Sequence, residues 1–159
     1  MVTKRYGIFP CIVSNINDPD KRGRIKVVCP DVLGDEAVSA WCEPVVPVAY
    51  DEGGDFCLPP KGEAVWVMFI DGDVNRPVYL GGWWSTNKTP LGDDYSGLEN
   101  TRVISYAGNK ITMKDGVIKI DTGGDTKVTI KCDSVTLKGD VTVTGDLKVS
   151  GSVSAKNIK

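Results

Sequence analysis

The 159-residue sequence contains no histidine. This absence excludes Ser-His-Asp and Cys-His catalysis and the histidine-based metal sites. The remaining carboxylates could supply a pair of the glycosidase kind, but they lie in turns or beside Lys and Arg, which favours a solvated surface role. These carboxylates are Glu43, Asp51, Glu52, Glu63 and Asp71. We therefore expect no enzyme, no cofactor and no metal site.

A charge surplus is also missing, since 19 Lys and Arg balance 21 Asp and Glu. The sequence therefore has no excess of positive charge that would attract nucleic acid or an anionic membrane. No apolar run approaches the length of a transmembrane helix, and no secretory leader is evident. The cysteines are few and show no CxxC spacing. We expect them to be small buried hydrophobes in a protein synthesised in the reducing bacterial cytoplasm.

The last third of the chain repeats a six-residue unit that begins at Gly139, Gly145 and Gly151. Each unit offers a turn and one short apolar-polar-apolar segment. Such a segment buries about two side chains, which cannot offset the roughly 1–2 kcal/mol lost per ordered residue. The units must therefore stack, and another surface must cover their apolar face.

Upstream the same alternation continues with looser spacing from Val103 and Ser105 onward, and it predicts about eight short strands between 101 and 155. One chain supplies too few repeats for a closed β-helix, whereas three intertwined chains would cover one another. We therefore predict a homotrimeric β-helix or β-prism, the alternative being an unstructured polar tail. The predicted trimer core consists of Ile111, Met113, Ile118, Ile120, Val128, Ile130, Val135, Leu137, Val141, Val143, Leu147, Val149 and Val153.

The first 84 residues are different, because longer Val-, Ile- and aromatic-rich segments alternate with Asp, Pro, Gly and Asn clusters. Five strands in about 80 residues suggest a small Greek-key barrel such as the OB-fold. The predicted strands are Tyr6–Ser14, Arg24–Cys29, Ala40–Val48, Glu63–Ile70 and Arg76–Gly82. The fold class is thus all-β, with a barrel domain at 1–84, a linker at 85–100 and a β-helix at 101–159.

Several motifs in the first part occur in a specific order. They are Asn17-Asp-Pro-Asp-Lys-Arg-Gly-Arg-Ile-Lys-Val27, Leu58-Pro-Pro-Lys-Gly-Glu-Ala-Val-Trp-Val-Met-Phe69 and Asp71-Gly-Asp-Val-Asn-Arg-Pro-Val-Tyr-Leu-Gly81. Over roughly residues 5–84 the chain resembles the OB domain of the central spike of contractile phage tails, also found in baseplate assembly protein V, pyocin-like particles and type VI secretion spikes. The resemblance implies a homotrimer below a baseplate hub protein, whose needle pierces the host envelope on sheath contraction.

Two departures from that family affect the expected role. Spikes with their own tip bind iron through paired histidines, which this chain lacks, so the resemblance implies a separate PAAR-like tip protein. Its expected platform is Val153, Ala155 and Ile158. The segment 85–100 is also too short for the lysozyme domain of some relatives. We expect a virion or phage-tail-like particle location, a mechanical role and transient contact with the host outer membrane.

A second function class remains open, because OB barrels commonly bind single-stranded nucleic acid through aromatic side chains in a basic groove. The barrel region has aromatics but no basic surplus. Trp66 and Phe69 belong to a strongly apolar strand, which favours core packing. We expect Trp83 and Trp84 to pack beneath the barrel or between subunits.

Overall fold

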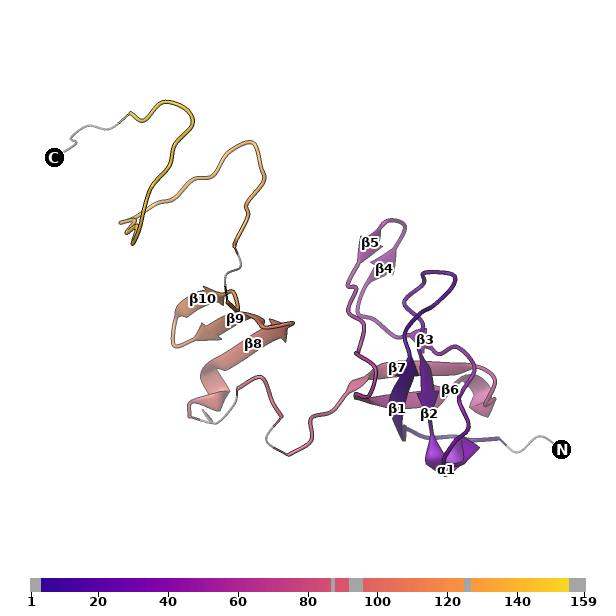
Figure 1. Ribbon diagram of the computed structural model, residues 1–159. Helices are drawn as coiled ribbons and strands as arrows, with labels where there is room; N and C mark the ends of the chain where they lie inside the picture. Colours follow the sequence, from indigo (N-terminus) through magenta and orange to yellow (C-terminus); the bar gives the residue numbers. More distant parts are fainter. Residues whose placement is uncertain (1–3, 87, 92–95, 125–126, 155–159) are drawn as a thin grey trace.

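The computed structural model describes residues 4–86, 88–91, 96–124 and 127–154. Strands dominate these residues, and helix within them is limited to the short α1 (Pro30–Leu33) and the 3-10 turns η1 (Ile70–Gly72) and η2 (Leu98–Asn100). Figure 1 shows an N-terminal barrel and a separate C-terminal sheet joined by an extended linker. No helix in the described segments has the length and hydropathy of a membrane span. The protein is therefore all-β, as predicted.

The N-terminal barrel follows the order β2-β1-β6-β7-β3, with β3 parallel to β7 and the other pairs antiparallel. Isolated bridges between Ile25 and Cys42 and between Val28 and Val38 join the two ends of this sheet. The result is a closed five-stranded Greek-key barrel of the OB type, which leaves few open edges. Its strands are β1 (Phe9–Asn15), β2 (Lys26–Val28), β3 (Glu43–Pro44), β6 (Ala64–Phe69) and β7 (Pro77–Gly82).

The barrel interior is filled by alternate residues of these strands, because successive side chains of a strand point to opposite faces. In β6, Val65, Val67 and Phe69 are buried. Phe9 packs on Phe69 with ring centroids 5.6 Å apart. The buried cluster is Cys11, Val13, Ile25, Val27, Cys29, Cys42, Val65, Val67, Phe69 and Tyr79. The barrel thus has a hydrophobic core of its own.

The predicted strand Ala40–Val48 is much shorter in the structure, where only β3 and the Cys42 bridge pair. Pro44 and Pro47 explain the difference, because proline has no N–H to donate to a sheet. The chain then forms a small hairpin of β4 (Ala49–Tyr50) and β5 (Gly53–Gly54), which extends from one end of the barrel (Figure 1). The sequence analysis predicted neither this hairpin nor α1, which begins at Pro30.

The C-terminal sheet is an antiparallel meander of β8 (Thr101–Tyr106), β9 (Asn109–Lys114) and β10 (Val117–Asp121). Two-residue turns connect the strands, Ala107-Gly108 and Asp115-Gly116, and all four residues have positive φ between 48° and 82°. Such turns match the twist of antiparallel strands and fix their register. These three strands confirm the first part of the predicted series.

Beyond β10, the described residues 127–154 form no strand within the single chain. The sequence analysis predicted five further strands in this region, from Val128 to Ala155. An isolated strand of three or four residues has no hydrogen-bonding neighbour and buries too little to persist. The segment instead forms an irregular trace beyond β10 that reverses its direction (Figure 1).

Candidate assembly surfaces

One face of the C-terminal sheet is almost entirely apolar, and we call it the C-terminal apolar face. The register aligns Ile104 with Ile111 and Ile111 with Ile120, so these three side chains form one row across the strands. The next row contains Met113 and Ile118, with Arg102 at its edge. The predicted core pairs of β9 and β10 therefore do share a face.

The residues of β8 that lie on the apolar face differ from the sequence prediction, which put Val103 and Ser105 there. The register pairs Val103 with Thr112 and Ser105 with Lys110, on the opposite face. The Ala107-Gly108 turn explains the difference, because it fixes which residue of β8 stands opposite each residue of β9. Ile104 is the apolar residue of β8 that the spacing analysis missed.

The C-terminal apolar face and the segment after it lack cover in the single chain. The thirteen predicted core residues, from Ile111 to Val153, have exposed fractions between 36% and 72%. Monomeric proteins rarely expose a contiguous apolar surface of this extent, which is typical of an interface. Of the predicted tip platform, Val153 is exposed, whereas Ala155 and Ile158 lie outside the described residues.

The opposite face of the C-terminal sheet is polar and basic. Lys110, Thr112, Lys114 and Lys119 line it together. Lys119 forms an ion pair with Asp121 at 2.7 Å, and the Nζ of Lys114 donates to the carbonyl of Ser96 at 3.1 Å. The sheet is therefore amphipathic, with this polar face suited to solvent and the C-terminal apolar face suited to burial.

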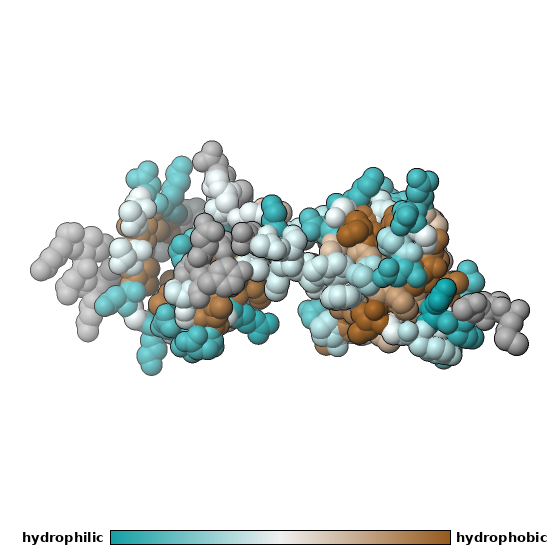
Figure 2. All heavy atoms as spheres, turned by 90° about the horizontal axis from the view of Figure 1, so that it is seen from below, coloured by the Kyte–Doolittle hydropathy of each residue, from teal (hydrophilic) through white to brown (hydrophobic). Residues whose placement is uncertain are grey.

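The barrel carries a second exposed apolar surface, on the outside of β1, β6 and β7, which we call the barrel outer face. It consists of Ile8, Ile12, Trp66, Met68, Leu80 and Trp83. Phe69 is buried as predicted, but the prediction of core packing for Trp66 is wrong. Trp66 alternates with the buried Val65 and Val67, points outward and stacks on Trp83 with centroids 4.4 Å apart. Figure 2 shows large apolar areas over the barrel.

An ion-pair cluster organises the loop between β1 and β2. The carboxylate of Asp18 accepts hydrogen bonds from the backbone N–H groups of Asp20, Arg22 and Arg24, and from the Arg24 guanidinium at 2.6 Å. The Arg24 hydrogen bond is the main reason that the pKa of Asp18 is well below its usual range. Tyr79 also donates to the carbonyl of Gly23 at 2.8 Å. The loop is therefore fixed to the barrel wall.

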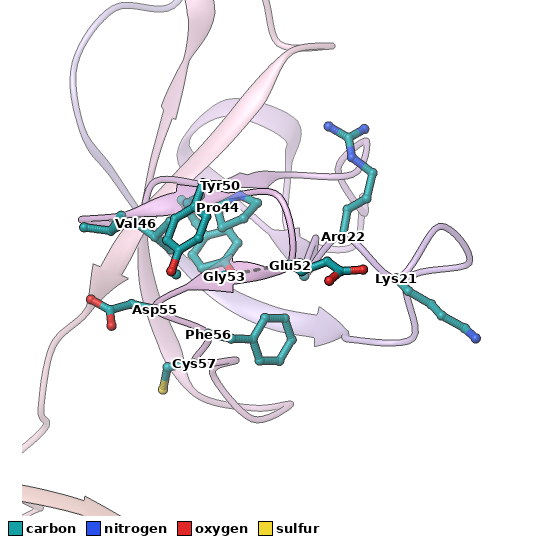
Figure 3. A pocket seen from close by; sticks show the side chains of 15 residues that line it. Lys21, Arg22, Pro44, Val46, Tyr50, Glu52, Gly53, Asp55, Phe56 and Cys57 are labelled. Atoms are coloured by element: carbon teal, nitrogen blue, oxygen red, sulfur yellow. Dashed lines mark hydrogen bonds between the residues drawn. The ribbon is translucent and has the colours of Figure 1, made fainter.

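A groove of about 420 Å³ lies between this loop and the β4-β5 hairpin (Figure 3). Lys21 and Arg22 stand at one side, and Glu52 and Asp55 come from the hairpin side, so the charges are mixed. A further aromatic residue of the barrel region, Trp41, lies near the Arg24 guanidinium at 5.6 Å and the Lys26 ammonium at 5.1 Å from its ring centroid. Neither site combines a basic groove with free stacking rings, which is what single-stranded nucleic acid requires.

Two of the carboxylates considered in the sequence form ion pairs with arginines. Glu43 bridges Arg22 at 3.1 Å, and Asp71 bridges Arg76 at 3.3 Å. Over the described parts of the chain, no group of three His, Cys, Asp or Glu side chains could hold a metal ion.

The cysteines follow the sequence prediction in part. Cys11, Cys29 and Cys42 are buried in the barrel, whereas Cys57 and Cys132 are exposed, and all five are free. Burial raises the pKa of Cys42 to about 11, so this thiol stays protonated and unreactive. For the single chain, the prediction that every cysteine is buried is wrong at Cys57 and Cys132, because both lie outside the strands that build the barrel core.

The closed Greek-key barrel with its own core places the N-terminal part of the chain in the class of OB domains. Residues 9–84 match the family model of the type VI secretion system/phage-baseplate injector OB domain, and this part of the chain belongs to that family. The match supports a structural role in a phage baseplate or secretion injector, and membership of this family implies association with other components of that assembly. No curated protein matched the chain with significant similarity.

Proposed function

We propose that the protein is the homotrimeric central spike of a contractile tail or injection device. The observation that carries the proposal is the C-terminal apolar face, which the hairpin register builds as continuous rows and which the single chain leaves uncovered. Three copies with these faces turned to a common axis would cover one another. The apolar pairs from Val128 to Val153 would extend the same axis as short strands that each pair with neighbouring chains.

The mechanical role follows from that geometry. About eight strands per chain, stacked at roughly 4.8 Å, would give a needle about 40 Å long. No strand of such a needle could detach without uncovering apolar side chains of two other chains. The basic and polar residues of the opposite face would point to solvent. When a sheath contracts, a stiff needle transmits force to a small area of the host envelope, and no catalysis is needed.

The barrel would attach this needle to the baseplate hub, and the blunt C-terminal end around Val153 would take a separate PAAR-like tip protein. Deletion of residues 152–159 should abolish tip binding and leave the trimer intact. We propose neither a nucleic-acid partner nor an enzymatic activity.

Native mass spectrometry of the purified full-length protein tests the proposal. We expect a mass of three chains that persists on dilution to micromolar concentration and resists SDS. Truncation after Ser96 removes the apolar face and should leave a soluble barrel with weaker self-association. A full-length protein that is a stable monomer at micromolar concentration would contradict the proposal, and a salt-dependent complex with single-stranded DNA would favour the nucleic-acid function instead.

A further inference from the structure

We propose that Cys11 and Cys29 are a redox-sensitive pair, which closes into a disulfide between β1 and β2 once the protein meets an oxidising medium. Both thiols are free, and both are buried in the barrel core. The inference concerns the barrel alone and goes beyond the proposed spike. The proposed function supplies only the occasion, because a protein made in a reducing cytoplasm and used after release passes from one redox environment to the other.

The first argument is the sheet register, which places the two cysteines opposite each other. The antiparallel strands β1 and β2 pair Ile12 with Val28, and the same register continued by one residue sets Cys11 against Cys29. Both side chains point into the barrel, since both residues belong to the buried cluster. Opposite residues of neighbouring strands that point to the same face are in direct contact.

The second argument is the kind of cross-strand pair that the cysteines form. Two residues along the ladder, the backbone N–H of Val13 donates to the carbonyl of Glu63 at 2.9 Å, and that of Val27 donates to the Oγ of Ser39 at 3.0 Å. Val13 and Val27 therefore form a non-hydrogen-bonded pair, and the alternation of the ladder makes the cysteine pair one as well. The Cα atoms of such a pair are about 4.5 Å apart, within the range of about 4.4–6.8 Å that a disulfide spans.

The third argument concerns access to the thiols. Cys29 directly precedes α1, a single helical turn without a fully buried residue, and the N–H of Leu33 donates to the carbonyl of Cys29 at 2.8 Å. Burial raises the pKa of the Cys11 thiol well above its usual range, and its hydrogen bond with the Cys29 thiol raises it further. The pair therefore reacts when α1 opens locally, and the disulfide is shielded from reductants once α1 closes again.

The chemistry of closure is thiol–disulfide exchange with a small-molecule disulfide such as oxidised glutathione. One cysteine thiolate attacks the small disulfide, forms a mixed disulfide and releases one glutathione thiol. The second cysteine then attacks the mixed disulfide, which forms the Cys11–Cys29 bond and releases the second glutathione. Two electrons and two protons pass from the cysteine pair to glutathione.

The third buried thiol, Cys42, provides an internal control. It stands opposite Ile25, and the two residues exchange both backbone hydrogen bonds, at 3.2 and 2.7 Å. Ile25 lies four residues before Cys29 in the sequence, so Cys42 is not the cross-strand neighbour of either cysteine. Its Sγ lies 3.5 Å from the Oγ of Ser39. We therefore expect Cys42 to remain a thiol when the pair closes.

Thiol counting on the full-length protein tests the inference. The exposed Cys57 and Cys132 are first replaced by serine, which leaves the three buried cysteines. The folded protein is incubated with oxidised glutathione just below its melting temperature, then denatured and treated with a maleimide. The free thiols should fall from three to one per chain, and peptide mapping should join Cys11 to Cys29. The oxidised barrel should melt roughly 10 °C above the reduced one, because the closed loop restricts the unfolded chain.

Three matched variants make the outcomes distinct. Cys11→Ala and Cys29→Ala each remove one partner, so neither an internal disulfide nor a rise in melting temperature should appear. Cys42→Ala should still lose both thiols of the pair. Retention of all three thiols by the parent protein, or a disulfide that involves Cys42 in any of these proteins, would overturn the inference. The native mass of the reduced protein reports separately on the proposed trimer, so the two proposals can fail independently.

Discussion

Replacement of Ile111 by aspartate tests the C-terminal apolar face most directly. Ile111 is the middle residue of the row Ile104, Ile111 and Ile120, and it is 36% exposed in the single chain. In a trimer this side chain would be fully enclosed. Losing the burial of one isoleucine costs about 1.5–3 kcal/mol, and an enclosed carboxylate without a partner adds several kcal/mol. Three-fold symmetry triplicates each change, so we expect a loss on the order of 10–20 kcal/mol per trimer.

Multi-angle light scattering and thermal melting would measure this effect. We expect Ile111→Asp to be monomeric at micromolar concentration and neutral pH. Enclosure would raise the carboxyl pKa above its ordinary value of about 4. Protonation would then favour the trimer, and acidification toward pH 4 should restore part of the assembly.

The matched control is Thr112→Asp, one residue further along β9 and on the opposite face, directly across from Lys119. Lys110 and Lys114 stand on either side of it on that face, so a carboxylate there is favourably placed. The control should remain trimeric with a nearly unchanged melting temperature. Equal effects of the two substitutions, or a stable Ile111→Asp trimer at neutral pH, would refute the assignment of the faces.

Three further predictions concern pH, thiols and metal. Because Asp18 has a lowered pKa in the folded barrel, its contribution to stability is present above about pH 4 and is lost on further acidification. Denaturant titrations of Asp18→Asn should therefore show less acid sensitivity than the wild type, and equal sensitivity would contradict this role. A thiol reagent should label the exposed Cys57 in the native trimer. It should label Cys132 only after dissociation, because Cys132 follows Ile130 by two residues and would lie on the same inward face of a strand in the proposed trimer. Rapid labelling of both thiols argues against an enclosed Cys132. Elemental analysis should find no stoichiometric iron, and its presence would contradict a separate tip protein.

The barrel could be predicted closely from the sequence because its signals are local. Alternation in β1, β6 and β7 and the Asp, Pro and Gly clusters between them are enough to place the strands. The barrel outer face could not be predicted in the same way. Trp66 lies in a strand that is apolar on both sides, so periodicity does not distinguish its inner face from its outer one. Only the closure of the barrel, through the bridges of Ile25 and Val28, decides which side is inside.

The Asp18 cluster is a second feature that spacing does not reveal. The Asp-Pro-Asp sequence predicts a turn, and the structure contains one. The multiple hydrogen bonds of Asp18, however, depend on the position of Arg24 just before β2. They also depend on the distant Tyr79, whose hydroxyl donates a hydrogen bond to the carbonyl of Gly23. Such contacts arise from the tertiary fold and have no sequence periodicity.

In the C-terminal third, the local sequence predicts the strands of the sheet but does not show how the hexapeptide region is paired. The turns Ala107-Gly108 and Asp115-Gly116 reverse the chain, and each reversal gives a strand a neighbour from the same chain. In the hexapeptide region the turns are different. Gly139 and Gly145 have φ of 133° and 124°, and no heavy atom lies within 4 Å of an added Cβ at either position.

These single glycines differ from the two-residue turns that close the hairpins of β8, β9 and β10. The segments between them keep the apolar alternation of strands, yet the described residues 127–154 form no strand. Apolar alternation without strand pairing in the single chain leaves the backbone groups of this segment without the hydrogen-bonding neighbours that strands require. The proposed trimer would meet this need, because every copy carries the same repeat at the same spacing.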